Sequence, residues 1–171
     1  MTSVPTQLTA ELAPVLDVQT HAQLVAAEAV LAHLSGRAPL RIERVTRQGV
    51  QYTLAPDPQA MQSNRGLLED VVMTALAQQE AATLLNVPTV QTDSGRDAAA
   101  LLRAGLTEPD EQAVSAEYLR VLRARTRAAL RRSWAEIQVV AAGLLEHGEL
   151  DAEALRYRVQ CAQGIRGTLL N

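Results

Sequence analysis

The chain has 171 residues, the length of one domain with a substantial core. All 16 basic residues are arginine and the net charge is −3, which argues against a protein that binds polyanions through its overall charge. The single cysteine, Cys161, excludes an internal disulfide and is typical of a reducing compartment, so we expect a cytoplasmic protein.

The first predicted elements are a helix and a β-hairpin. Residues 17–35 predict a helix, because they are rich in alanine and leucine and Gly36 follows as a stop signal. Two alternating segments, 40–45 and 50–54, flank a turn that contains a glycine and predict a hairpin with one wet face. Because an isolated hairpin is marginally stable in water, we expect it to pack on helices.

The rest of the chain predicts helices separated by turns. Periodic apolar residues indicate the helices, and proline, glycine, asparagine and aspartate mark their ends. In chain order we expect a loop over 55–66, a helix over 67–86, a short helix over 95–104, a helix from Pro109 to Gly148 that is continuous or kinked, and a last helix capped by Asp151.

Together these elements predict a mainly α fold with one small β-hairpin. We expect one helical domain over 17–163, an N-terminal segment over 1–16 and a C-terminal tail over 164–171. The first residues lack the pattern of a signal peptide, and no apolar run reaches the roughly 18 residues of a membrane span. We therefore expect no membrane association.

Glu28 is the unusual residue of the first helix. It shares a face with Leu24 and Leu31, although a buried carboxylate is costly. One interpretation puts it at the edge of the apolar face or pairs it with an arginine, and the other has it line a cleft. His21 lies on the same face, so a metal could use this row, but ligands on metal-binding helices normally lie at i and i+4, and a chance alignment is the preferred explanation. His33 points elsewhere and is expected at the surface.

Asp97 has a local structural explanation. Ser94 and Asp97 have the spacing of a capping box, with Ser94 as the N-cap and Asp97 reaching back to it. No phosphate-binding loop of the GxxxxGK type exists in a chain without lysine, and no Ser-His-Asp or Cys-His set stands out. Cys161 lies in an amphipathic helix and is interpreted as a packing residue.

The arginines between Arg120 and Arg132 form a charged helix face. With Tyr118 and Trp134 nearby, this face could contact nucleic acid. The acidic chain argues against that, and runs of charge usually mark a solvated helix face.

Three segments in order resemble the peptidase domain of FtsH-type ATP-dependent zinc proteases. AEAVLAHLSGRAPLRIERVTRQGVQYTL resembles its HEAGH helix, strand and turn, and the stretch MTALAQQEAATLLN to DAAALLRAG resembles the region of its SNDL motif. YLRVLRARTRAALRRSWAEIQVVAAGLLEHGELDAEAL resembles its closing pair of helices. The resemblance covers about 20–156 in order and spacing, without a rare motif, and it implies an FtsH peptidase-like helical fold.

The resemblance also shows where this chain departs from the family. The HEAGH motif supplies two histidine ligands and a glutamate base to zinc. Its first histidine falls on Leu24, its glutamate on Val25 and its second histidine on Glu28, while the third ligand falls on Asp97. Leucine cannot bind zinc and valine cannot take a proton. No catalytic set is therefore intact, and we expect no enzyme activity of the family's kind and no zinc or other cofactor.

What the resemblance implies is a non-catalytic, peptidase-like scaffold that binds a peptide or protein, with homo-oligomerisation left open. Its cleft would contain Glu28, Asp97 and Tyr52. One alternative is a metallopeptidase that holds zinc through Glu28, Asp97 and His21. The other is a helical nucleic-acid-binding protein that uses the face from Arg120 to Arg132.

Overall fold

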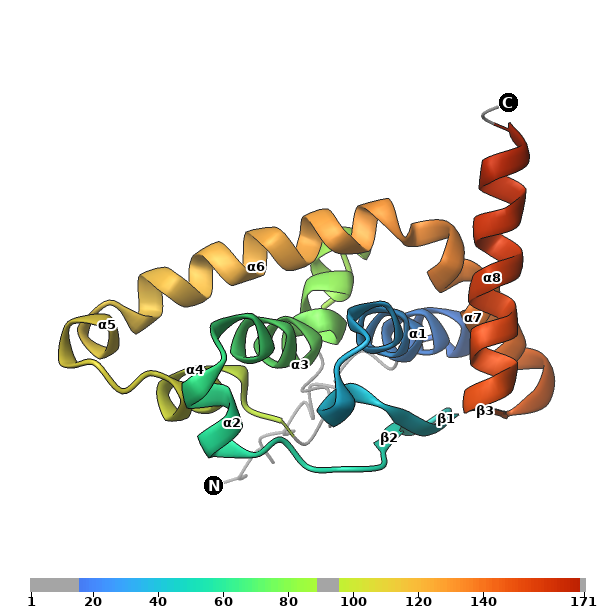
Figure 1. Ribbon diagram of the computed structural model, residues 1–171. Coiled ribbons are helices and arrows are strands. Elements are labelled where there is room, and N and C mark those ends of the chain that lie inside the picture. The colour runs from blue at the N-terminus through green and yellow to red at the C-terminus, as the bar shows by residue number, and fades with distance from the viewer. Residues whose placement is uncertain (1–15, 89–95, 170–171) are drawn as a thin grey trace, which may run out of the picture.

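The computed structural model describes residues 16–88 and 96–169. Most of the N-terminal segment expected over 1–16 therefore lies outside the described residues. The described part is mainly helical and contains one small antiparallel sheet, which confirms the predicted fold class (Figure 1).

Helix α1, Val18–Ser35, is the centre of the core. The Asp17 side chain caps its first turn by accepting a hydrogen bond from the Thr20 amide at 2.9 Å. Gly36, in the left-handed conformation at φ 64°, ends it as predicted. Every residue from 24 to 32 is buried, because α1 packs against α3 on one side and α7 on another. Small alanines on all sides allow this close approach.

The predicted hairpin forms, and a third strand joins it. Strands β1, Ile42–Thr46, and β2, Gly49–Tyr52, pair antiparallel as expected. Strand β3, Glu149–Asp151, pairs with the other side of β1, so the sheet order is β2-β1-β3. The expectation of a hairpin alone was therefore incomplete. A short 3-10 helix, Ala38–Leu40, occupies the start of the predicted first strand.

Helices α2 and α3 follow the sheet. Residues 55–66 were predicted as a loop, and this was wrong in part because α2, Pro58–Ser63, forms there with Asp57 as its N-cap. Helix α3, Arg65–Leu85, agrees closely with the predicted helix. Asn86, in the left-handed conformation at φ 54°, ends it.

The C-terminal half contains five helices in the described residues: α4, Ala98–Gly105; α5, Pro109–Ala113; α6, Ser115–Arg132; α7, Trp134–His147; and α8, Ala152–Leu169. The long helix expected after Pro109 is interrupted at Val114 and again at Ser133. Gly148 ends α7 as predicted, and Asp151 caps α8 by accepting a bond from the Ala154 amide. Helix α8 continues to Leu169, within the segment expected as a C-terminal tail.

Of these helices, α7 and α6 contact α1, and α8 packs on α7. In Figure 1, α6 runs across α3 at the top, the sheet lies below α1, and α8 stands at one end beside α7. Helix α4 contacts α3 at Gly105, where an added Cβ would come within 2.3 Å of the Leu68 side chain. A larger residue at Gly105 would thus push α4 away from α3.

Candidate functional site

The Glu28 carboxylate lies inside the protein and has two neutral hydrogen-bond partners. Glu28 is only 2% exposed to solvent. The Tyr52 hydroxyl, at the end of β2, donates to Glu28 Oε1 at 2.7 Å, and Gln78 Nε2, from α3, donates to Glu28 Oε2 at 2.6 Å. Three elements therefore converge on this carboxylate.

The surroundings of Glu28 shift the pKa of its carboxyl group upward. Burial raises the pKa of Glu28, and the bonds from Tyr52 and Gln78 and the charge of Arg96 offset only part of that rise. Burial and the adjacent Glu28 carboxylate also raise the pKa of Tyr52, so the phenol stays a neutral donor. The first interpretation put Glu28 at the edge of the apolar face or paired it with an arginine. Glu28 is buried and its hydrogen bonds come from neutral groups, although the charge of Arg96 acts on its carboxyl group.

A small hollow opens beside Glu28. Its volume is about 210 Å³, and the side chains around it are mostly polar. This supports the other interpretation, in which Glu28 lines a cleft. The lining comes from α1, α3 and both strands of the hairpin: Glu28, Thr46, Gln48, Gly49, Val50, Gln51 and Gln78.

Arg96 completes this group of side chains. Its guanidinium lies over the Tyr52 ring, 3.9 Å from the centroid. Its buried Nη1 atom has no hydrogen-bond partner among the described residues. The sequence analysis did not identify Arg96 or Gln78 as part of this site. For Gln78 a signal was available, because it is a polar residue within the apolar repeat of the helix over 67–86.

Asp97 has a different role from Arg96. Its Oδ1 accepts hydrogen bonds from the Ala99 and Ala100 amides at 3.0 and 3.1 Å, so Asp97 is itself the N-cap of α4. The prediction was that Ser94 caps this helix and that Asp97 reaches back to it. The predicted role of Asp97 was wrong, and Ser94 lies outside the described residues. The carboxylate thus serves its own helix, while its neighbour Arg96 reaches Tyr52.

The two histidines of α1 lie in separate surroundings. His21 Nε2 donates to the Arg47 carbonyl at 2.6 Å and so ties α1 to the turn of the hairpin. His33 is half-buried, which corrects the expectation of a plain surface residue. No three His, Cys, Asp or Glu residues in 16–88 and 96–169 form a group that could hold a metal ion, so Glu28, Asp97 and His21 are not gathered into one.

Leu24 and Val25, which the resemblance aligns with the first two positions of the zinc motif, are core residues. They are 1% and 0% exposed. Neither side chain offers a lone pair or a titratable proton to a cleft.

The arginine face of α6 is partly turned inward. Arg123 and Arg127 bind Glu80, a residue of α3 that is 2% exposed, at 2.7 and 2.6 Å. Arg125 binds Glu69 at 2.6 Å. The interpretation of a solvated face therefore holds only in part: Arg120, Arg125 and Arg131 are exposed, whereas Arg123 and Arg127 are half-buried. Three arginines of this face connect α6 to α3. These three are already paired, which reduces what the face could offer to phosphates.

Comparisons with protein families and curated proteins found no match: no protein-family model matches the chain, and no curated protein is significantly similar to it. Within the described residues, no helix combines the length and the apolar composition that crossing a bilayer requires.

Proposed function

We propose that this protein is a non-catalytic, peptidase-like scaffold that binds an extended peptide along strand β2. The observation that carries the proposal is the position of β2. It is an edge strand in the order β2-β1-β3, and the hollow beside Glu28 and Gln78 opens next to it. An edge strand can take up one more strand through its unpaired backbone groups.

The resemblance to FtsH-type peptidase domains supports the same mode. In that family the substrate peptide pairs with an edge strand beside the zinc site. Here the positions of two zinc-site residues are taken by Leu24 and Val25, which cannot bind metal or accept a proton. A backbone-driven contact does not depend on either residue, so binding can persist without hydrolysis.

The surroundings of the hollow suggest what it recognises. Its side-chain donors and acceptors come from Thr46, Gln48, Gln51 and Gln78, none of which carries a charge. Glu28 adds a carboxyl group whose pKa is raised by burial. Most of this lining can only exchange hydrogen bonds, so the hollow suits a neutral polar side chain of the peptide.

Fluorescently labelled casein, an unfolded chain, is the probe for this proposal. We expect saturable binding and no cleavage on gels, with or without added zinc. Gln51→Lys places a charge at the β2 edge and should weaken binding by roughly fivefold, since edge lysines disfavour strand addition. Gln160→Lys, on an exposed position of α8, is the matched control and should leave binding unchanged.

Two results would overturn the proposal. Zinc-dependent hydrolysis that Glu28→Ala abolishes would favour the metallopeptidase alternative. Failure of casein to bind, or equal effects of both lysine substitutions, would exclude peptide capture at β2.

A further inference from the structure

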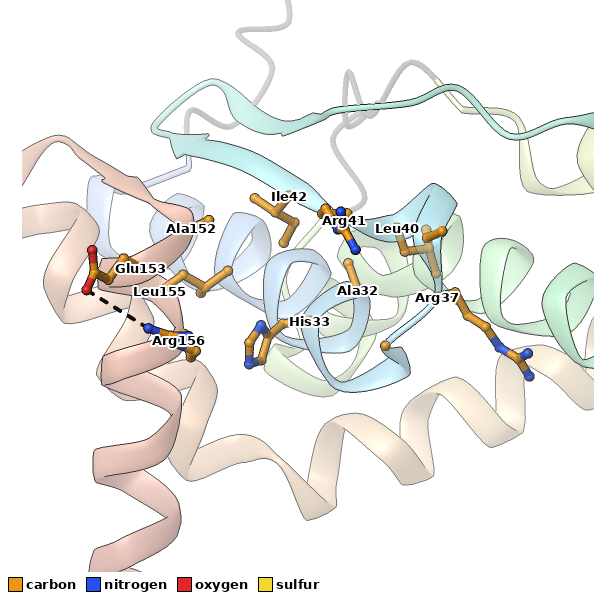
Figure 2. A pocket seen from close by; sticks show the side chains of 12 residues that line it. Ala32, His33, Arg37, Leu40, Arg41, Ile42, Ala152, Glu153, Leu155 and Arg156 are labelled. Atoms are coloured by element: carbon orange, nitrogen blue, oxygen red, sulfur yellow. Dashed lines mark ion pairs between the residues drawn. The ribbon is translucent and has the colours of Figure 1, made fainter.

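A second and larger pocket lies near the C-terminal end of α1. Its volume is about 590 Å³, within the range of small-molecule sites. It is formed where the end of α1, the start of β1 and the first turns of α8 meet (Figure 2). Its apolar wall is made by buried side chains of the core: Ala32, Leu40, Ile42 and Leu155.

The rim of this pocket is positively charged. Arg41 is exposed and forms no ion pair with another described residue. Arg156 has only Glu153 of its own helix, at 4.0 Å. Arg37, by contrast, binds Asp70 at 2.8 Å, and its guanidinium points away from the pocket in Figure 2. Two arginines are thus left to face an apolar hollow.

We propose that this pocket binds a small organic anion with an apolar chain. The chain would lie on Leu40, Ile42 and Leu155, and the acid group would be held by Arg41 and Arg156 at the rim. Guanidinium groups bind carboxylates and phosphates through paired N–H donors, which fits such an acid group. The site does not share residues with the β2 groove, so it stands whether or not peptide binding does.

His33 couples this site to pH. It lines the pocket, and burial followed by the charge of Arg156 lowers its pKa. Other charged residues around the pocket are Arg41, Glu153 and the Arg37–Asp70 pair. A bound anion offsets the repulsion from Arg156 and raises the pKa of His33. The bound form then holds more protons, so the affinity for the anion rises as pH falls through that pKa.

The experiment is a nuclear magnetic resonance titration with four six-carbon probes: hexanoate, hexyl phosphate, 1-hexanol and hexylamine. We expect hexanoate or hexyl phosphate to shift Ala32, His33 and Leu155 saturably, with 1-hexanol at least about tenfold weaker and hexylamine not binding. The ratio of the two anions distinguishes a carboxylate ligand from a phosphate monoester. The pKa of His33, followed through its ring protons, should be higher in the anion complex than in the free protein.

Substitutions test the contribution of the rim. Arg41→Gln and Arg156→Gln should each weaken anion binding by roughly fivefold, because each removes one charge-assisted contact. Arg103→Gln, an exposed arginine on α4, is the matched control and should change nothing. All three positions are on the surface, so the variants are expected to fold.

The proposal is overturned by any of three results. One is the absence of saturable shifts in the pocket residues up to about 20 mM of either anion. Another is equal binding of 1-hexanol and hexanoate. The third is anion binding that the two rim substitutions and the Arg103→Gln control affect alike.

Discussion

Glu28 and Glu80 are buried to the same extent, yet they are neutralised in different ways. Each is 2% exposed and lies on a helix of the core. Glu80 is held between two arginines of α6, at 2.7 and 2.6 Å. Glu28 is held by a phenol and an amide, and a hollow opens beside it. A carboxylate that two arginines bind connects two helices, whereas one that is hydrogen-bonded by neutral groups beside a hollow marks a place where protonation or a ligand matters.

The largest expected effect is at Glu80. Glu80→Ala leaves the partly buried guanidinium groups of Arg123 and Arg127 without a counter-charge, so we expect the free energy of unfolding to fall by about 3 kcal/mol. Urea denaturation followed by circular dichroism measures this. Arg125→Ala breaks a more exposed pair and, as the control, should cost less than about 1 kcal/mol. Equal losses of unfolding free energy in the two variants would mean that the Glu80 ion pairs stabilise the contact between α3 and α6 no more than an exposed pair does.

A smaller effect is expected at Tyr52. Tyr52→Phe removes the donor to Glu28 and keeps the ring beneath Arg96, and it should cost about 2 kcal/mol at pH 7 because a buried acceptor loses its partner. In a Glu28→Gln background the same substitution should cost less than about 1 kcal/mol, since a neutral amide tolerates the loss better. A cost that is the same in both backgrounds would show that the phenol does not act through the carboxylate.

The smallest effect, and the one that depends on pH, is expected for Glu28→Gln. Glutamine imitates the protonated acid and keeps hydrogen bonds available to Tyr52 and Gln78. Since the folded-state pKa of Glu28 is raised, its stabilising contribution is complete below the unfolded value near 4.5 and is lost as pH rises through the folded value. The variant should therefore match the wild type near pH 4.5 and gain on it, by up to about 1 kcal/mol, toward pH 8.

Parallel urea titrations of the two proteins over this pH range test the sign directly. Titratable groups that both proteins share contribute equally to the two free energies of unfolding, so the difference between the proteins reports on Glu28. A difference that shrinks as pH rises would contradict the raised pKa and would make Glu28 resemble Glu80.

The ends of elements were the most predictable part of the fold. Gly36 and Gly148 end their helices as predicted, because the left-handed conformation at a helix end is a local requirement of the backbone. Helix α2 could have been found, since Asp57 before Pro58 is an N-cap followed by a proline at the first helical position. The error there was to read prolines only as signs of a loop.

Strand β3 could not be found in this way. It is three residues long, and its pairing with β1 joins positions about a hundred residues apart, such as Val45 and Leu150. A segment of three residues is too short to show the alternation of apolar and polar residues that predicts a strand. It is extended because a partner strand lies beside it.

The sequence by itself determined the mainly helical class and the central helix with its acidic residue. Those properties reside in composition, periodicity and single positions. Only the tertiary structure decided that Glu28 meets Tyr52 and Gln78, that Glu80 meets two arginines, and that a basic pocket opens beside His33. The partners of Glu28 lie 24 and 50 positions away, and packing selects contacts over such separations.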